Sequence, residues 1–220
     1  SRLRRPAGRL RDLPIWSKLG LIMLVPTLAT VVVGTNGLID HINEASDAER
    51  ARTLSVLSQA AGGLVDHLQN ERAFGVMIAT TQPNTADRKA AIEGYTDENP
   101  KVDAAKLPYS QQKAALDNVP EQVGVLLRRL DLNLLELPSI RSRTARVAIP
   151  LEDIRGAYDP LITDLLNVRD AAAQLAQDTT LSDRLRVVAA VARAKDFISQ
   201  QRVVGLEIIG KGDFTPSLRS

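Results

Sequence analysis

The first feature of the chain is a stretch without charge near its N-terminus. Residues 19–39 carry no acidic or basic side chain, and most of them are aliphatic. A run of about 20 apolar residues is long enough to cross the hydrocarbon core of a bilayer as a helix. Trp16 and Lys18 precede the run, where an interfacial aromatic ring and a snorkelling cation are typically found. The pattern therefore predicts a transmembrane helix over residues 19–39.

The charges on either side of this stretch predict its orientation. Basic residues crowd the segment before it, namely Arg2, Arg4, Arg5, Arg9 and Arg11, and acids follow it, namely Asp40, Glu44, Asp47 and Glu49. Because basic segments stay on the cytoplasmic side, residues 1–18 are expected to be a cytoplasmic arm and residues 40–220 an extracytoplasmic domain. The expected location is the plasma membrane, with the lipid bilayer as a partner.

Two other interpretations of the apolar stretch stay open. A secretory signal peptide is disfavoured because the run exceeds a typical hydrophobic region and no small-x-small cleavage site follows it. A buried core helix with a basic tail is the second alternative. Pro26, Gly34, Asn36 and Gly37 interrupt the apolar run and favour that alternative.

The remainder of the chain has a helical pattern with a few breaks. Helices are expected at about residues 45–81, 151–177 and 181–209, with a broken helical region at about 85–133 and a short segment between Pro138 and Pro150. Pro100 and Pro108 are expected to interrupt the broken region, and Pro120 and Pro160 to kink their helices. No heptad pattern is sustained. The predicted fold is all-α, a transmembrane helix followed by an up-and-down four-helix bundle.

The composition narrows the possible chemistry. Aromatic residues are only 3% of the chain, which disfavours a β-sheet core, and the absence of cysteine excludes disulfides, thiolate metal sites and cysteine nucleophiles. The only histidines, His41 and His67, are far apart and lack the acid and proline that follow a kinase phosphoacceptor. The acids are scattered without a nucleophile beside them. We therefore expect no catalysis, no metal and no cofactor in this fragment.

Most other basic residues have a simple interpretation. The basic isoelectric point, about 9.0, comes from the N-terminal arm, so it does not indicate nucleic-acid binding. The pair Arg128-Arg129 and the group Arg141, Arg143 and Arg146 are expected on solvated helix faces, with anion steering as a possible additional role. His67 is expected to be a solvated or hydrogen-bonded helix residue.

A short string occurs in both the first and the last helix of the predicted bundle. Residues 71–75 are ERAFG and residues 201–205 are QRVVG, so each contains an arginine with a glycine three residues later. On a helical wheel Arg72 shares its face with Val65, Leu68 and Val76. Arg202 similarly shares its face with apolar residues, Val191, Ile198, Leu206 and Ile209. Both arginines are therefore predicted to face the core, where Gly75 and Gly205 leave room beside them.

A guanidinium in a core needs an anionic or polar partner. An unpaired buried charge costs roughly several kcal/mol, and arginine does not lose its proton. Ordinary interhelical salt bridges are one possibility, because Glu71, Glu207, Asp66 and Asp196 are close in sequence. A bound planar oxyanion is the other, because the guanidinium fork matches carboxylate or nitrate. A ligand-free structural or dimerisation bundle and an organic-carboxylate sensor both stay open.

Three segments resemble a known family. The strings LQNERAFGVMIA, AYDPLITDLLNVRDAAAQLA and AKDFISQQRVVGLEII are similar to the nitrate- and nitrite-sensing (NIT) domain of bacterial receptors, over roughly residues 64–214. The resemblance implies that Arg72 and Arg202 contact nitrate or nitrite, with Gly75 and Gly205 beside them. The chain departs from the family pattern at Ala73 and Gln201, where the family commonly has glycine and glutamate.

The resemblance also implies a wider context. The opening string RLRDLPIWSKLGLIMLVPTLA is similar to the start of actinobacterial sensor histidine kinases that carry this domain outside the membrane. The family domain continues into a second helical bundle, so we expect the sensor domain to be truncated at its C-terminal end. The expected function is an extracytoplasmic sensor that binds a small anion and signals to a histidine kinase, and bundles of this kind usually act as homodimers.

Overall fold

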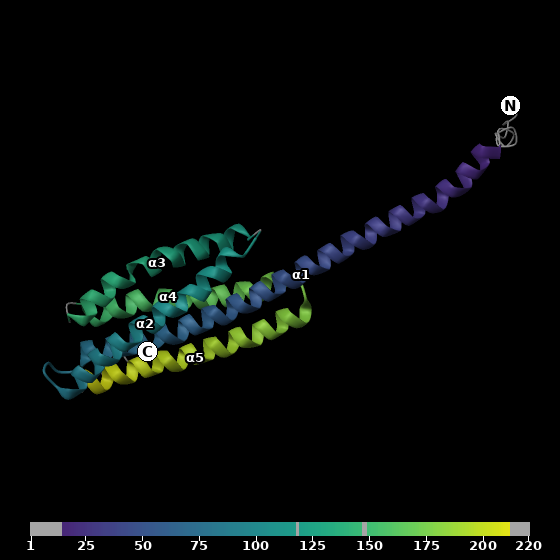
Figure 1. The fold of residues 1–220 in the computed structure, drawn as a ribbon. Helices are drawn as coiled ribbons and strands as arrows, with labels where there is room; N and C mark the ends of the chain where they lie inside the picture. The colour runs from purple at the N-terminus through teal and green to yellow at the C-terminus, as the bar shows by residue number, and fades with distance from the viewer. Residues whose placement is uncertain (1–14, 118, 147–148, 212–220) are drawn as a thin grey trace, which may run out of the picture. The chain divides into compact units, whose positions relative to one another are not determined.

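The structure is a computed structural model that describes the backbone of residues 15–117, 119–146 and 149–211, and the side chains from residue 46 to residue 210 within these ranges. It contains five helices, α1 (Ile15–Thr80), α2 (Ala86–Ala114), α3 (Glu121–Ala145), α4 (Leu151–Leu175) and α5 (Thr179–Lys211) (Figure 1). The described residues form no strand. The all-α prediction is confirmed, while the predicted number of bundle helices is wrong.

The chain divides into two units, residues 1–48 and residues 49–220. The predicted arm, residues 1–18, lies largely outside the described residues. The predicted membrane span, residues 19–39, has a helical backbone within α1, but its side chains are not among those described. In the part of the chain that the structure describes, no helix is both long enough and apolar enough to cross a membrane.

The region predicted as one broken helical stretch forms two helices. α2 is continuous through Pro100 and Pro108, and the break comes between Ala114 and Glu121, with Pro120 as the N-cap of α3. The segment predicted to begin after Pro138 belongs to α3, which is continuous through that proline. α4 likewise continues through Pro160. The division of the broken region into α2 and α3 raises the number of helices described within residues 49–220 from four to five.

The helix-internal prolines are tolerated because of where they lie. Pro100, Pro108, Pro138 and Pro160 are all exposed, so the carbonyls that lose a hydrogen-bond donor can be solvated. A proline inside a helix costs about 3 kcal/mol or more. The opposite faces of these helices bury large side chains, among them Tyr95, Val102, Tyr109, Leu137 and Tyr158. Tertiary packing of these faces outweighs the local cost of the prolines.

A large hydrophobic core joins the helices of residues 49–220, and a smaller second cluster contains Ile78, Ala91 and Tyr95. The large core includes Leu57, Ala61, Leu64 and Leu68 of α1, which recur at the three- and four-residue spacing of one helix face. α4 contributes a long buried face, including Leu161, Ile162 and Leu165. The links between consecutive helices are short, so neighbouring helices run in opposite directions (Figure 1). The core-facing prediction for the Arg72 face of α1 is confirmed.

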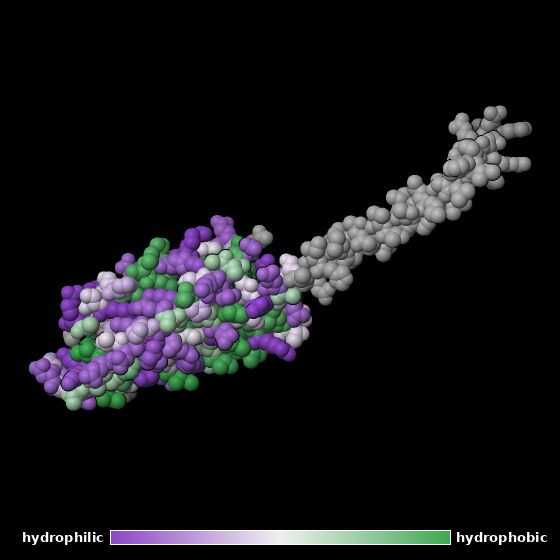
Figure 2. All heavy atoms as spheres, viewed as in Figure 1, coloured by the Kyte–Doolittle hydropathy of each residue, from purple (hydrophilic) through white to green (hydrophobic). Residues whose placement is uncertain are grey.

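The predicted core face of α5 is wrong. Val191, Ile198 and Ile209 are 63%, 67% and 80% exposed, whereas the buried residues are Ser182, Leu185, Ala189, Ala192, Asp196, Val203 and Glu207. The buried stripe still has helical spacing, but it contains small and acidic residues in place of large aliphatic ones. Figure 2 accordingly shows hydrophobic side chains on the surface along α5. Apolar periodicity alone therefore indicated the wrong side of this helix.

Candidate anion site

A buried polar segment of α1 contains the first predicted site residue. Gln69, Glu71 and Arg72 are consecutive or nearly so, and all three are almost inaccessible to solvent. Arg72 is 1% exposed and is one of the largest fully buried side chains of the bundle. The prediction that Arg72 lies in the core is confirmed. A buried guanidinium requires compensation, so its contacts determine what the site can do.

Arg72 connects three helices through its two terminal nitrogens. Its Nη1 donates to Oδ1 of Asp159 on α4 at 2.6 Å. Its Nη2 donates to Oγ of Ser199 on α5 at 2.9 Å and lies 3.5 Å from Oδ1 of Asp196. Its Nε is buried and has no hydrogen-bond partner among the described residues. The guanidinium therefore has an unpartnered Nε–H donor buried at the junction of α1, α4 and α5.

The two carboxylates of this site are held differently. Asp196 is 6% exposed and accepts hydrogen bonds from Gln69 Nε2 at 2.9 Å and from Gln200 Nε2 at 2.7 Å. The side chain of Asp159 is 37% exposed, and its other cationic neighbour is Arg155 Nε at 3.9 Å. Asp159 is consequently the carboxylate that solvent can stabilise if it leaves Arg72. A competing anion would displace Asp159 more readily than Asp196.

The second predicted arginine lies elsewhere on its helix. Arg202 is exposed, and in the described part of the chain it has no hydrogen bond or ion pair, while the next residue, Val203, is buried at 2% exposure. The prediction that Arg202 faces the core is wrong because the buried stripe of α5 runs on the other side. Arg202 nevertheless follows Ser199 by three residues, a spacing that places two side chains on neighbouring positions of a helix. The structure does not bring the two guanidinium groups together.

The two glycines of the repeated string have different surroundings. A Cβ atom on Gly75 would lie 3.2 Å from Cγ2 of Ile154 and 3.5 Å from atoms of Thr144 and Tyr95. A Cβ atom on Gly205 would meet nothing within 4 Å. Close packing therefore explains Gly75, where α1 meets buried residues of α2, α3 and α4. No described residue packs against Gly205, so the space beside this glycine is open.

This difference gives a paired prediction. Gly205→Ala is expected to raise the free energy of unfolding by about 0.5–1 kcal/mol, because alanine favours an open helix position over glycine. Gly75→Ala is expected to lower it by about 1 kcal/mol, because overpacking of about 1–3 kcal/mol exceeds the same helix gain. Urea denaturation of the two variants measures both changes. Equal shifts in the two variants would contradict the packing assignment.

A second buried ion pair lies beside Arg72 and was missed in the sequence. Arg141 of α3 donates from Nε to Glu71 Oε1 at 2.6 Å and from Nη2 to Oε2 at 2.9 Å, a bidentate pair. Tyr158 donates to the same Oε1 at 2.7 Å, and Asp103 accepts from Arg141 Nη1 at 2.9 Å. The prediction of a solvated Arg141 is wrong, since only 9% of the residue is exposed. Glu71 thus pairs with Arg141, and Arg72 pairs instead with Asp159 of α4 and Asp196 of α5.

The electrostatics of this network follow from burial and pairing. Burial lowers the pKa of Arg141, but its hydrogen bonds and charge pairing with Glu71 and Asp103 outweigh burial and raise the pKa above its ordinary value. Burial, followed by the charge of Glu71, raises the pKa of Tyr158 well above its ordinary value. Tyr158 therefore stays protonated and acts as a donor to Glu71. The network is a fixed structural unit next to the candidate site.

The remaining polar candidates are accounted for. His67 Nδ1 lies 2.6 Å from Glu98 Oε1, so the prediction of a hydrogen-bonded helix histidine is confirmed. The side chain of His41 lies outside the described residues. No group of metal-ligating side chains occurs among the residues that the structure describes.

Comparison with known proteins agrees with the family resemblance. Residues 63–220 match the family described as nitrate and nitrite sensing, and the chain therefore belongs to this family. The fold is similar to that in the structure of the NasR transcription antiterminator, with a TM-score of 0.66 and 19% sequence identity. That similarity covers 83% of this chain and 50% of the other, so this chain spans half of that protein. No curated protein matches this chain.

Proposed function

We propose that residues 49–220 are a nitrate- or nitrite-sensing module in which Arg72 is the principal ligand-binding residue. Family membership supports the ligand class. The observation that carries the site is that Arg72 is fully buried at the junction of three helices with an unused Nε donor. A planar oxyanion fits such a guanidinium fork in a bidentate arrangement.

The proposed binding event is an exchange of anions on Arg72. Nitrate accepts hydrogen bonds from Nε and Nη2, the two donors on one edge of the guanidinium, and takes the place of Ser199 on Nη2. The charge of the anion then replaces that of Asp159, which leaves Nη1. Asp159 then moves into solvent, which its 37% exposure permits. Release of this contact removes one link between α1 and α4 and shifts the balance between two helix arrangements. Arg202, one turn beyond Ser199, contributes to the site by turning its exposed side chain toward the anion.

Thermal unfolding tests the proposed ligand. A ligand that binds only the folded state stabilises it by about 2.7 kcal/mol when its concentration is a hundred times its dissociation constant. The melting temperature of the full chain should therefore rise in sodium nitrate or nitrite relative to sodium chloride at the same ionic strength. Sodium acetate serves as the carboxylate control. An identical melting temperature in nitrate, nitrite and chloride would contradict the proposal.

Removal of the competing carboxylate gives a sharper prediction. Asp159→Asn should raise the affinity for nitrate by about tenfold, corresponding to about 1.4 kcal/mol, because the anion no longer displaces a charged partner. Asp153→Asn on the same helix makes the same charge change at an exposed position and should leave the affinity unchanged. Isothermal titration with nitrate measures both. An equal gain in nitrate affinity in the two variants would show that the effect comes from the net charge of the chain and not from Asp159.

Membrane attachment is a further part of the proposal. The uncharged residues 19–39 and the basic residues before them support an N-terminus inside the cell and residues 40–220 outside it. The similarity of the opening string to sensor histidine kinases supports a homodimeric kinase as the output. A protease added to intact cells should then cut residues 49–220. If these residues are cut only after the cells are lysed, the proposed orientation is contradicted.

A purely structural role is the second candidate. The pairing of Arg72 with Asp159 and Asp196 favours this role, because a guanidinium whose charge is already balanced by carboxylates needs no ligand for that purpose. The unused Nε and the exposed Asp159 distinguish the two roles. A structural bundle would show no nitrate-dependent stabilisation, whether Asp159 is present or replaced.

A further inference from the structure

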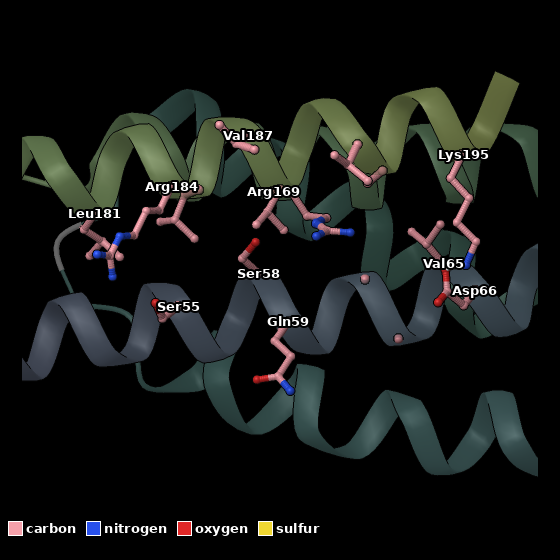
Figure 3. A pocket seen from close by; sticks show the side chains of 16 residues that line it. Ser55, Ser58, Gln59, Val65, Asp66, Arg169, Leu181, Arg184, Val187 and Lys195 are labelled. Atoms are coloured by element: carbon pink, nitrogen blue, oxygen red, sulfur yellow. Dashed lines mark ion pairs between the residues drawn. The ribbon is translucent and has the colours of Figure 1, made fainter.

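A cavity of about 680 Å³ opens between α1 and α5, with α4 behind it. It is called the Arg169 cavity here because that residue of α4 extends into it; Figure 3 shows Arg169 and Ser58 pointing into the space between the two helices. Its volume falls within the range of about 300–1,000 Å³ that is usual for small-molecule sites. On α1 the lining extends from Ser55 to Asp66, and Asp66, the lining residue nearest to Arg72, precedes it by six residues, about 9 Å along the helix.

Arg169 is buried without a partner. Its exposure is 8%, its Nε has no hydrogen bond, and among the described residues no carboxylate forms an ion pair with it. The acids that influence it are already paired, since Asp66 lies 2.5 Å from Lys195 Nζ and Asp170 pairs with Arg193. Burial lowers the pKa of Arg169, and the charges of Asp66 and Asp170 only partly oppose this effect. An arginine remains charged under these conditions, so a positive charge without an ion-pair partner lies in the cavity.

The surroundings of Arg169 also favour an anion. Ser58 is 1% exposed, and its Oγ has no hydrogen-bond partner among the described residues. The lining includes two further cations, Arg184 and Lys195, against a single acid, Asp66. A Cβ atom on Gly62 would lie 2.6 Å from Arg169 Nη1, so glycine is what allows the guanidinium to lie against α1. Two unpartnered buried polar groups therefore point into one positively charged cavity.

The remainder of the lining is apolar. Val65 of α1 and Leu181, Leu185, Val188 and Ala192 of α5 are apolar residues that line the cavity. A nitrate ion alone leaves this wall uncovered, whereas a ligand with an aliphatic body covers it and gains the free energy of apolar burial. A guanidinium prefers a carboxylate as its bidentate partner. We propose that the Arg169 cavity binds an organic monocarboxylate, with its carboxylate on Arg169 and Ser58 and its aliphatic part against α5.

This site is separate from the proposed nitrate site and does not depend on it. The cavity lies between the segment of α1 from Ser55 to Asp66 and the segment of α5 from Leu181 to Lys195. An organic acid bound there would link the same two helices that Arg72 links further along. The two ligands would therefore act on a common pair of helices through different residues.

Calorimetric titration of the full chain with butanoate, hexanoate and octanoate tests the proposal, with hexanamide as the neutral control. At least one acid should bind, and hexanamide should bind at least tenfold more weakly than hexanoate. Arg169→Met should lower the affinity for the acids at least tenfold, whereas Arg186→Met, an exposed α5 residue outside the cavity, should not. Arg72→Lys should also leave their affinity unchanged. Absence of binding by all three acids, equal binding of hexanamide, or unchanged binding by Arg169→Met would overturn the proposal.

A stability measurement checks that Arg169 is uncompensated in the absence of ligand. Arg169→Met should raise the melting temperature of the ligand-free chain by about 2–4 °C, because it removes an unpaired buried charge. A fall in melting temperature would show that the guanidinium has a stabilising partner and would overturn the assignment. Nitrate binding that persists in Arg169→Met, together with loss of hexanoate binding, would support two separate sites. Competition between nitrate and hexanoate for one site would contradict them.

Discussion

Replacement of Arg141 by methionine is expected to lower the free energy of unfolding by about 3–5 kcal/mol, the largest single effect predicted for this chain. The substitution leaves Glu71, which is 0% exposed, as a buried carboxylate whose bidentate cation is gone. Tyr158 and its partner Tyr95 remain as hydrogen-bonding groups but carry no compensating charge. Denaturation by urea, followed by circular dichroism, measures the loss.

Two further variants show whether the effect belongs to the ion pair. Arg143→Met on the same helix removes an exposed cation and should change the free energy of unfolding by no more than about 0.5 kcal/mol. The double variant Glu71→Gln with Arg141→Met removes both charges and should recover a large part of the loss, because no buried charge is left unpaired. A double variant as unstable as Arg141→Met alone would indicate that lost packing causes the change.

Arg72→Met is expected to cost about 3 kcal/mol, while Arg202→Met should change stability by no more than about 0.5 kcal/mol. Removal of Arg72 leaves Asp196 buried without its cation and frees Asp159 into solvent, so the cost falls mainly on Asp196. Arg202 is exposed, and its removal disturbs no described contact. Denaturant midpoints of the two variants measure the contrast. Equal losses would show that Arg202 also lies within the packed interior.

The fold could be predicted from the sequence where the buried residues of a helix are also its most hydrophobic residues. On α1, large aliphatic residues at Leu57, Leu64 and Leu68 are the buried residues, so the helical wheel identified the correct face. On α5 the buried stripe contains Ala189, Ala192 and Asp196, whereas Val191 and Ile198 are exposed. A wheel ranks residues by hydropathy and therefore selected the opposite face. This inversion explains why Arg202 was assigned to the core.

The candidate site could be predicted only in part for a related reason. Arg72 was found because an arginine occurred within a stripe of apolar residues. Asp159 and Ser199, its partners, lie 87 and 127 residues away, and no local pattern connects such distant positions. Arg141 was missed because Arg143 and Arg146 beside it form a basic group that is typical of a solvated face. Arg169 was missed because its neighbours in the sequence do not show whether an arginine is buried without a partner or paired with an acid.

The most direct test of the central claim, that Arg72 binds nitrate, is a calorimetric titration of the full chain and of Arg72→Lys with sodium nitrate at constant ionic strength. Lysine preserves the positive charge toward Asp159 and Asp196 but removes the planar fork. The wild-type chain should show one saturable site, and Arg72→Lys should bind nitrate at least tenfold more weakly while retaining its helical circular dichroism. Absence of nitrate binding by the wild-type chain, or equal affinity in the two proteins, would contradict the claim.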